Sequence, residues 1–289
     1  DMTVNDAVDF FMPKDYWAHN WWGMEIGYDL QRSSADVPVA NTENHLHPDR
    51  SHGMYIPGAH TYAALWQNAL HGQNCSALWC WERAYDDGKS DFNGLVLNRP
   101  ECLEAYAHCA LDLSRLADRL APLQNLPPSA LVLYSTEYIL RGGQHALGIT
   151  YRAASFIGQP LGVVSEEMVA EIGQGVLTRP FDSAKVILLP NVAGATLPED
   201  VQRGLERFKA GGGQVLETGA ISEGDLHRLL AENAARWGLP DYPVARDPET
   251  GLPAFGVETR GTVDGNVARI SLCNHTGHPI RIRLPKPGV

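Results

Sequence analysis

The sequence lacks several features that mark large classes of protein. No apolar run in its 289 residues approaches the roughly 20 residues that cross a bilayer, and no basic stretch followed by an apolar one opens it as a signal peptide would. The five cysteines include no Cys-x-x-Cys pair, so we expect reduced, buried thiols rather than a zinc site or a disulfide framework. The formal net charge of −11 disfavours nucleic acid and anionic membrane surfaces as partners.

The common phosphate-binding and nucleophile motifs are also absent. The sequence contains no Gly-x-Gly-x-x-Gly, no Gly-x-x-x-x-Gly-Lys-Ser/Thr and no Gly-x-Ser-x-Gly. The glycine run 211–213 lies between a predicted helix and a predicted strand, where it is expected to end the helix. We therefore expect no cofactor and no metal. The compartment stays open, with the cytoplasm favoured.

What the sequence does contain is a strand that ends in polar side chains. The extended run 38–42 leads directly into Glu43, an amide and two imidazoles. A helix over 59–71, a strand over 76–81 that also ends in charge, and a helix over 101–120 follow. Parallel α/β barrels carry their chemistry at the C-terminal ends of their strands, so Glu43 is the leading candidate for a catalytic carboxylate.

The first 28 residues are rich in aromatic side chains, which have two interpretations. They are core residues of a strand and a helix, or part of them form a platform on which the flat face of a sugar stacks. We expect most to be core. The residues are Phe10, Phe11, Tyr16, Trp17, Trp21, Trp22 and Tyr28.

Beyond a proline-rich linker at 122–128 the pattern changes. Short apolar strands are expected at 131–134, 161–164, 186–189 and 214–217, with helices between them, one of which covers 198–210. This alternation predicts a doubly wound parallel sheet. The glutamates near the strand ends are expected to be caps and surface charges, namely Glu137, Glu166, Glu167 and Glu217.

The last 50 residues have a third character. Alternating runs at 256–260 and 267–272 flank a turn at 263–266, which predicts a hairpin, and 280–284 alternates again. A small antiparallel sheet is expected here.

Five short motifs occur in a specific order in the N-terminal part of the chain. They are Tyr28-Asp29-Leu30-Gln31-Arg32-Ser33, the strand from Pro38 to Glu43, Pro57-Gly58, His71-Gly72 and Trp79-Cys80-Trp81. In this order and at this spacing they resemble the C-terminal part of the barrel in glycoside hydrolase family 42. That family consists of retaining β-galactosidases of the large (β/α)8 clan A.

The resemblance implies a fold for nearly the whole chain. Residues 1–124 would hold strands six to eight of a (β/α)8 barrel. Residues 129–238 would form a flavodoxin-like or amidotransferase-like α/β domain of the trimerisation type, without catalytic residues, and 240–289 a small β domain. It also implies a homotrimer that hydrolyses terminal β-D-galactosides or related β-glycosides by double displacement.

The resemblance assigns roles to individual residues as well. Glu43 would be the nucleophile that attacks the anomeric carbon to form a glycosyl-enzyme. Tyr16 would hydrogen-bond the nucleophile from strand six, and Trp81 would form the aromatic wall of the sugar subsite. Further expected substrate contacts are Asn41, His45, His47, Trp79 and Arg83. For each histidine we give equal weight to a second interpretation, that of a loop residue hydrogen-bonded within the protein.

Some positions depart from the family pattern. Asn93 stands where the family has a histidine, Glu82 precedes Arg83, and residues 44–47 differ, which leaves galactose specificity open. In the clan the acid/base glutamate follows an asparagine at the end of strand four, and this sequence has no Asn-Glu dipeptide. We therefore expect the first five strands and the acid to lie upstream of Asp1 or on a second chain.

Two other functional classes remain open. The first is a catalytically inactive module that binds carbohydrate or drives oligomerisation. The second is an amidotransferase-like hydrolase centred on 130–220, which the absence of a nucleophile motif disfavours.

Overall fold

A computed structural model of the chain describes residues 3–5, 22–45, 55–79, 99–175 and 180–285. The chain divides into two compact units, Asp1–Asn125 and Leu126–Val289. None of the helices within the described residues is both long enough and apolar enough to span a membrane.

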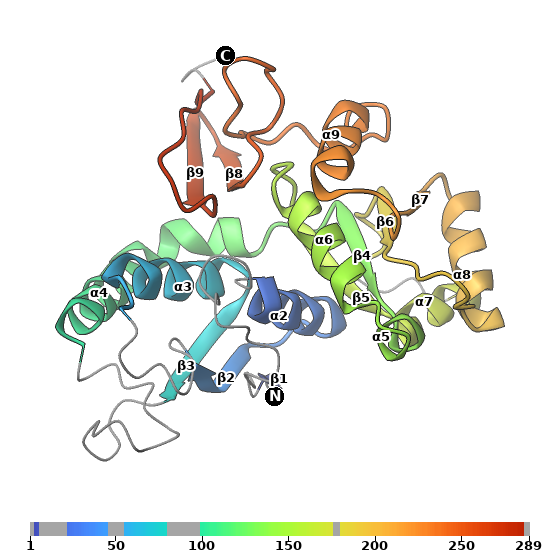
Figure 1. Ribbon diagram of the computed structural model, residues 1–289, viewed down its shortest axis with the longest axis horizontal. Coiled ribbons are helices and arrows are strands. Elements are labelled where there is room, and N and C mark those ends of the chain that lie inside the picture. Colours follow the sequence, from blue (N-terminus) through green and yellow to red (C-terminus); the bar gives the residue numbers. More distant parts are fainter. Residues whose placement is uncertain (1–2, 6–21, 46–54, 80–98, 176–179, 286–289) are drawn as a thin grey trace. The chain divides into compact units, whose positions relative to one another are not determined.

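The first unit contains a three-stranded parallel sheet. Its strands β1 (Thr3–Asn5), β2 (Val39–His45) and β3 (Gln73–Trp79) are hydrogen-bonded in chain order (Figure 1). Parallel neighbours need crossover connections, and the helices α2 (Trp22–Ser34) and α3 (Gly58–Leu70) supply them, with α4 (Pro100–Gln124) following β3. The carboxyl ends of β2 and β3 therefore lie at the same edge of the sheet.

Helix α3 forms where its apolar spacing predicts. Leu65 is buried against Cys109 of α4, and Tyr62 and Trp66 stack with ring centroids 6.0 Å apart. The Tyr62 hydroxyl donates a 2.8 Å hydrogen bond to Asp112. Gly72 follows with a φ of 112°, a left-handed conformation that favours glycine and ends the helix. The predicted helix over 59–71 is confirmed.

Helix α4 runs four residues further than expected and includes Pro122, so the linker predicted from residue 122 is wrong at its start. Proline removes one helical hydrogen bond, but contacts in the last turn compensate for that loss. Leu123 is buried, and Gln124 Nε2 donates a 2.7 Å hydrogen bond to the carbonyl of Ala69. Arg32 also donates to Asn125 Oδ1 at 2.8 Å, directly after the helix.

The cysteines within the described residues are free thiols, as expected, but they are not all buried. Cys102 and Cys109 are buried, and burial raises the pKa of the Cys109 thiol to about 12. Cys75 is exposed on β3, contrary to the expectation of buried thiols.

The second unit is built on a four-stranded parallel sheet with the order β5-β4-β6-β7. These strands are β4 (Ala130–Tyr134), β5 (Leu161–Ser165), β6 (Val186–Leu189) and β7 (Gln214–Glu217), all within a few residues of prediction. The helices between and after them are α5 (Thr136–Leu140), α6 (Gln144–Ser155), α7 (Glu166–Gly173), α8 (Glu199–Ala210) and α9 (Glu223–Asn233). The expected combination of parallel sheets and helices is confirmed.

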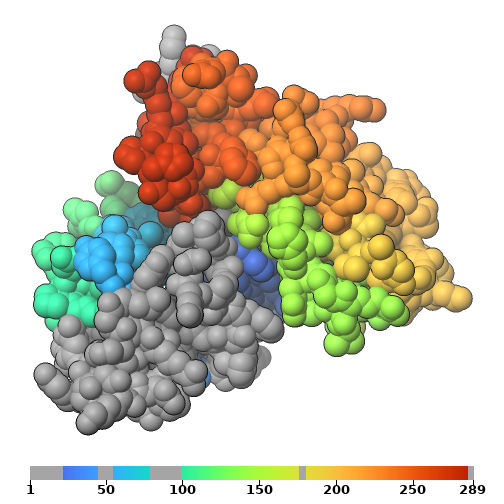
Figure 2. All heavy atoms as spheres, in the orientation of Figure 1, coloured from blue at the N-terminus to red at the C-terminus, as the bar shows by residue number. Residues whose placement is uncertain are grey.

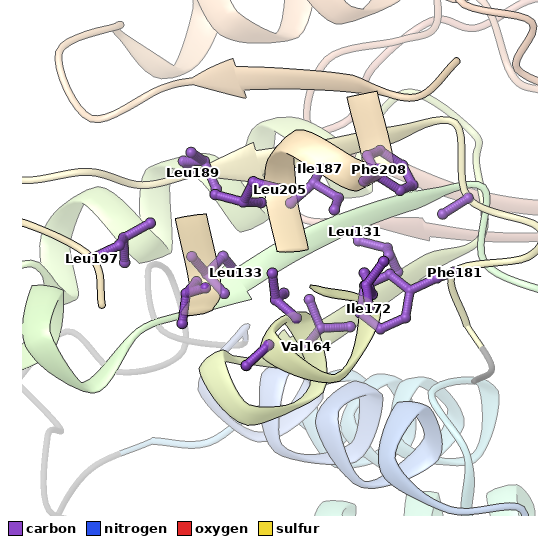
Figure 3. Close-up of a cluster of buried hydrophobic side chains, with 14 of the residues drawn as sticks. Leu131, Leu133, Val164, Ile172, Phe181, Ile187, Leu189, Leu197, Leu205 and Phe208 are labelled. Atoms are coloured by element: carbon purple, nitrogen blue, oxygen red, sulfur yellow. The ribbon is translucent and has the colours of Figure 1, made fainter. Parts of the chain in front are cut away.

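Helices cover both faces of this sheet. Alternate residues of β4 and β6, among them Leu131, Leu133 and Ile187, pack with Leu205 and Phe208 of α8 in a buried cluster (Figure 3). Helix α7 contributes to the same cluster and packs against α8. Helix α6 contacts β4 and α9. Because successive strand residues point to opposite faces, the intervening buried residues of β4 face the layer formed by α6 and α9.

The spacing of apolar residues in helix α8 determines which face of the helix is buried. Val201, Leu205 and Phe208 are buried, while the charged side chains between them form part of the surface in the yellow-to-orange region of Figure 2. The helix ends at Gly211, and Gly212 has a φ of 93°. The glycine run acts as the predicted helix end.

Three of the four glutamates near the strand ends lie at helix starts. Ser135 and Ser165 cap α5 and α7 by accepting from backbone amides, and Glu137, Glu166 and Glu167 lie in the first turns, where negative charge is favoured. Glu217 accepts a 3.1 Å hydrogen bond from Asn191 Nδ2. The expectation of surface charges is confirmed, but the caps are the serines rather than the glutamates.

The chain then forms the hairpin β8 (Val257–Asp264) and β9 (Val267–Asn274), as predicted. The expected third strand at 280–284 is wrong, because Arg283 makes only a single bridge with Arg246. Pro279 and Pro285 flank this run and lack the N–H groups that a ladder needs. Its alternation has another cause: Ile280 and Ile282 pack against a buried apolar cluster.

Candidate active site

The candidate site lies at the carboxyl end of β2. Glu43 is half-buried there, two residues before the strand ends at His45. The backbone of His45 pairs in register with that of Trp79 at the end of β3. The structure therefore brings together the two strand ends that the sequence marks as polar. Four predicted site residues lie outside the described residues, namely Tyr16, His47, Trp81 and Arg83.

The strand carries a bulge at Glu43. Asn41 pairs with Ser76, and Asn44 pairs with Leu78, so β2 has one more residue than β3 between these two pairs. The extra residue lies in the segment Thr42-Glu43. Bulges bend a strand and re-aim its side chains, and they are common beside active sites.

A second irregularity lies earlier in the same pair of strands. Val39 pairs with Gln73 and Ala40 with Cys75, which leaves Asn74 unpaired in β3. The Asn74 side chain accepts a 2.9 Å hydrogen bond from the Val39 amide. β3 begins at Gln73, three residues before the strand predicted from residue 76.

A buried hydrogen-bond network lies beneath Glu43. Asn41 accepts a 3.0 Å bond from the Glu43 amide through Oδ1 and donates a 2.7 Å bond to the Tyr28 hydroxyl through Nδ2. The Tyr28 hydroxyl accepts a second bond, of 3.0 Å, from Gln73 Nε2. Burial, and to a lesser extent the carboxylate of the buried Glu25, raises the pKa of Tyr28 above its ordinary value. Tyr28 therefore stays a neutral hydroxyl.

Asn44, the residue after Glu43, is fully buried. Its Nδ2 donates a 2.8 Å hydrogen bond to Ser76 Oγ of β3. Its Oδ1 has no hydrogen-bond partner within the described part of the chain. Asn41 and Asn44 thus anchor the backbone on both sides of the bulge.

The motifs that flank this strand contact one another. His71 Nδ1 lies 3.1 Å from Asp29 Oδ1 and 3.0 Å from Asp29 Oδ2, in a buried pair between the end of α3 and α2. A Cβ on Gly72 would lie 2.4 Å from two carbons of the Arg32 side chain, so only glycine allows this approach. The Asp-Leu-x-Arg-Ser and His-Gly motifs are therefore halves of one packing arrangement.

Sequence reasoning missed most of this supporting layer. Gln73 and Asn44 were not expected in the site, and Tyr28 was expected as a core or sugar-stacking aromatic rather than as the hydrogen-bond acceptor for Asn41, although the Asp29 and His71 motifs were noted for their order. Asn41 gives the one local signal of this supporting layer, because it is a polar residue two positions before the candidate carboxylate. Among the described residues, no group of three or more His, Cys, Asp or Glu side chains is arranged to hold a metal ion.

Comparison with known proteins gives no match by sequence. No protein-family model matches the chain, and no curated protein does so. Solved structures do match. An exo-carrageenase of family GH42 from Bacteroides ovatus gives a TM-score of 0.62 at 15% identity, covering 93% of this chain and 40% of the carrageenase.

Two β-galactosidases give weaker matches. That of Bacillus circulans sp. alkalophilus has a TM-score of 0.51 at 15% identity over 77% of this chain and 34% of its own. That of the psychrophilic Marinomonas ef1 has a TM-score of 0.50 at 17% identity over 70% of this chain and 32% of its own.

The chain shares its fold with glycoside hydrolases of family 42. The resemblance in the motifs is thereby confirmed at the level of fold. The chain spans 40% or less of the length of each of these three structures.

Proposed function

We propose that this chain is part of a retaining β-glycosidase of the β-galactosidase type, with Glu43 as its nucleophile. The observation that carries the proposal is the position of Glu43: a half-buried carboxylate at the end of a parallel strand, in a fold shared with family 42 enzymes. The βαβαβα order of the first unit fits strands six to eight of a (β/α)8 barrel, with β2 as the seventh.

The proposed reaction has two steps. In the first, a Glu43 oxygen attacks the anomeric carbon and forms an ester, while the bond to the aglycone oxygen breaks and an acid protonates that oxygen. In the second, water attacks the same carbon, loses its proton to the conjugate base of that acid, and releases Glu43. Two inversions give retention.

The acid is proposed to come from a segment or chain that accompanies these 289 residues. Retention requires two carboxyl groups roughly 5–5.5 Å apart. The clan's acid follows an asparagine, and no Asn-Glu dipeptide is present here. The similar structures are also more than twice as long as this chain.

The remaining predicted residues complete the proposed site. Trp81 would line the sugar subsite, and Tyr16 would hydrogen-bond the nucleophile. Contacts with sugar hydroxyls would come from His45, His47, Trp79 and Arg83. Residues 129–238 would hold the subunits of a homotrimer together. Sedimentation velocity of the complete protein tests the trimer, and a monomer at micromolar concentration would contradict it.

Substitution of Glu43 tests the function directly. The complete protein should hydrolyse an aryl β-D-galactoside or a related aryl β-glycoside, and Glu43→Gln should lower kcat by about 10³-fold or more because the carboxamide is a poor nucleophile. Glu104→Gln, an exposed position on α4, is the matched control and should retain full activity. The proposal fails if Glu43→Gln is as active as Glu104→Gln.

A substrate panel tests the specificity. Aryl β-D-galactosides and carrageenan oligosaccharides represent the substrates named for the similar enzymes. The anomer of the first-formed product, followed by NMR, should be β for a β-glycoside. An α product would contradict double displacement.

A further inference from the structure

Asn41 is almost completely buried, with 1% of its surface exposed. Both ends of its side-chain amide are bonded within the protein, Oδ1 to the Glu43 amide and Nδ2 to the Tyr28 hydroxyl. A residue in this state has little left to offer a sugar hydroxyl. Its contacts instead join helix α2 to the backbone of the candidate nucleophile.

The Glu43 amide lies where the regular ladder is interrupted. Within the described residues, β1 pairs with β2 from Val39 to Asn41, and the pairing of β2 with β3 skips Thr42 and Glu43. A backbone N–H inside a protein needs a partner, and an unsatisfied one costs about 1–3 kcal/mol. The Asn41 side chain supplies that partner and thereby stabilises the bulge.

The bulge changes the direction of Glu43. In a regular strand, residues two apart share a face, so Glu43 would point to the same face as Asn41. Instead Asn41 and Asn44, three apart, are both buried, and Glu43 between them is half-buried. The extra residue interrupts the regular alternation, so Glu43 no longer has to share the face of Asn41.

The anchor of Asn41 is itself buried and hydrogen-bonded. Tyr28 is fully buried, and its hydroxyl accepts from both Asn41 and Gln73, at 2.7 and 3.0 Å. The raised pKa of Tyr28 keeps this hydroxyl neutral throughout the pH range in which glycosidases work. The network therefore links α2, β2 and β3 at one point.

We infer that Asn41 is a positioning residue, which fixes the bulge in β2 and with it the direction of the Glu43 carboxylate. This role replaces the direct sugar contact expected from the sequence. It rests on the proposed function, because Glu43 must be the nucleophile for its direction to affect turnover.

The test compares Asn41→Ala, Asn41→Asp and Asn68→Ala in the complete protein. Asn41→Ala removes the acceptor for the Glu43 amide, whereas Asn41→Asp keeps an acceptor in the same place. Asn68, on α3, is equally buried and contributes no bond to β2 in the described structure. Asn68→Ala therefore controls for the general loss of a buried amide.

We expect Asn41→Ala to lower kcat by about 10–100-fold with KM nearly unchanged, because a misplaced nucleophile slows the chemical step more than binding. Asn41→Asp should recover most of this loss. Its added carboxylate should also move the acid limb of the pH profile to higher pH, because two nearby carboxylates repel each other. Asn68→Ala should keep kcat within about twofold of the native value.

Amide hydrogen exchange gives a readout that needs no turnover. The Glu43 amide should lose protection in Asn41→Ala and keep it in Asn41→Asp and Asn68→Ala. A rise in KM with unchanged kcat in Asn41→Ala would instead mark a sugar contact and overturn the inference. The same holds if Asn41→Ala matches Asn68→Ala in both kcat and exchange.

The Glu43→Gln variant separates the two claims. If Glu43→Gln is inactive and Asn41→Ala behaves as the control, the function stands and the positioning role falls. If Glu43→Gln is fully active, the proposed function fails and the positioning role falls with it.

Discussion

Replacing His71 and Asp29, singly and together, tests how strongly their buried pair joins α2 to the end of α3, the two helices that flank β2 in the chain. The two side chains are 1% and 4% exposed, and His71 Nδ1 lies about equally far from both carboxylate oxygens, at 3.1 and 3.0 Å. His71→Phe deprives a buried carboxylate of this hydrogen bond. We expect a loss of roughly 3 kcal/mol in the free energy of unfolding, and a similar loss for Asp29→Leu.

The double variant should cost much less than the sum. Replacing both members of a buried pair by apolar residues removes the desolvation penalty together with the attraction. We therefore expect the free energy of unfolding of the double variant to be at least about 2 kcal/mol higher than the value obtained by adding the two single losses. The expected coupling is larger than that of an exposed pair, which is worth at most about 1 kcal/mol.

Urea unfolding followed by tryptophan fluorescence measures this coupling. All of the seven tryptophans except Trp237 lie within residues 1–125, so a Trp237→Phe background makes the signal report on the first unit. Additive costs of the two single substitutions would refute the interaction between α2 and the end of α3.

Two further predictions concern the second unit. Alanine is normally favoured over glycine in a helix, but a Cβ on Gly204 would lie 2.0 Å from the carbonyl oxygen of Val169, so Gly204→Ala should destabilise by about 1–3 kcal/mol. Gly224→Ala in α9, where the added Cβ meets nothing within 4 Å, should stabilise by about 0.5–1 kcal/mol, both changes being measured by the loss of helical circular dichroism in urea with Trp237 retained. Equal stabilities of the two variants would contradict the close packing of α7 and α8. Burial lowers the pKa of His227, so its contribution to stability is complete above the unfolded pKa near 6.5 and is lost as pH falls through the folded value. Free energies of unfolding from pH 5 to 8 should fall more steeply on acidification for the native chain than for His227→Phe, and parallel curves would remove His227 as the cause.

Local rules in the sequence predict most of the elements. The spacing of Leu65 and its neighbours gives α3, and the buried positions of α8 follow the same period. The hairpin is also local, because a two-residue turn at Gly265-Asn266 fixes its register with Asp264 opposite Val267. Each of these features depends on residues close together in the chain, so the sequence alone contains enough information.

Features that depend on distant partners could not be predicted. Pro122 suggested a linker, but contacts of the following residues with Ala69 and Arg32 extend α4 past it. The alternation at 280–284 suggested a strand, but it reflects packing against an apolar cluster rather than a sheet partner.

The candidate site shows the same division. The position of Glu43 near a strand end could be predicted, since polar residues after an extended apolar run are a local pattern, although β2 continues to His45. The bulge was not, because an extra residue in β2 exists only by comparison with β3. Nor was the bond from Asn41 to Tyr28, which joins a strand to a helix 13 residues earlier.

Covalent trapping of the glycosyl-enzyme tests the central claim most directly. The complete protein is treated with an activated 2-deoxy-2-fluoro-β-D-galactoside, which slows the second step more than the first, then digested and analysed by mass spectrometry. We predict one sugar per chain, attached to Glu43. Attachment to any other residue would contradict the assignment of Glu43 as nucleophile.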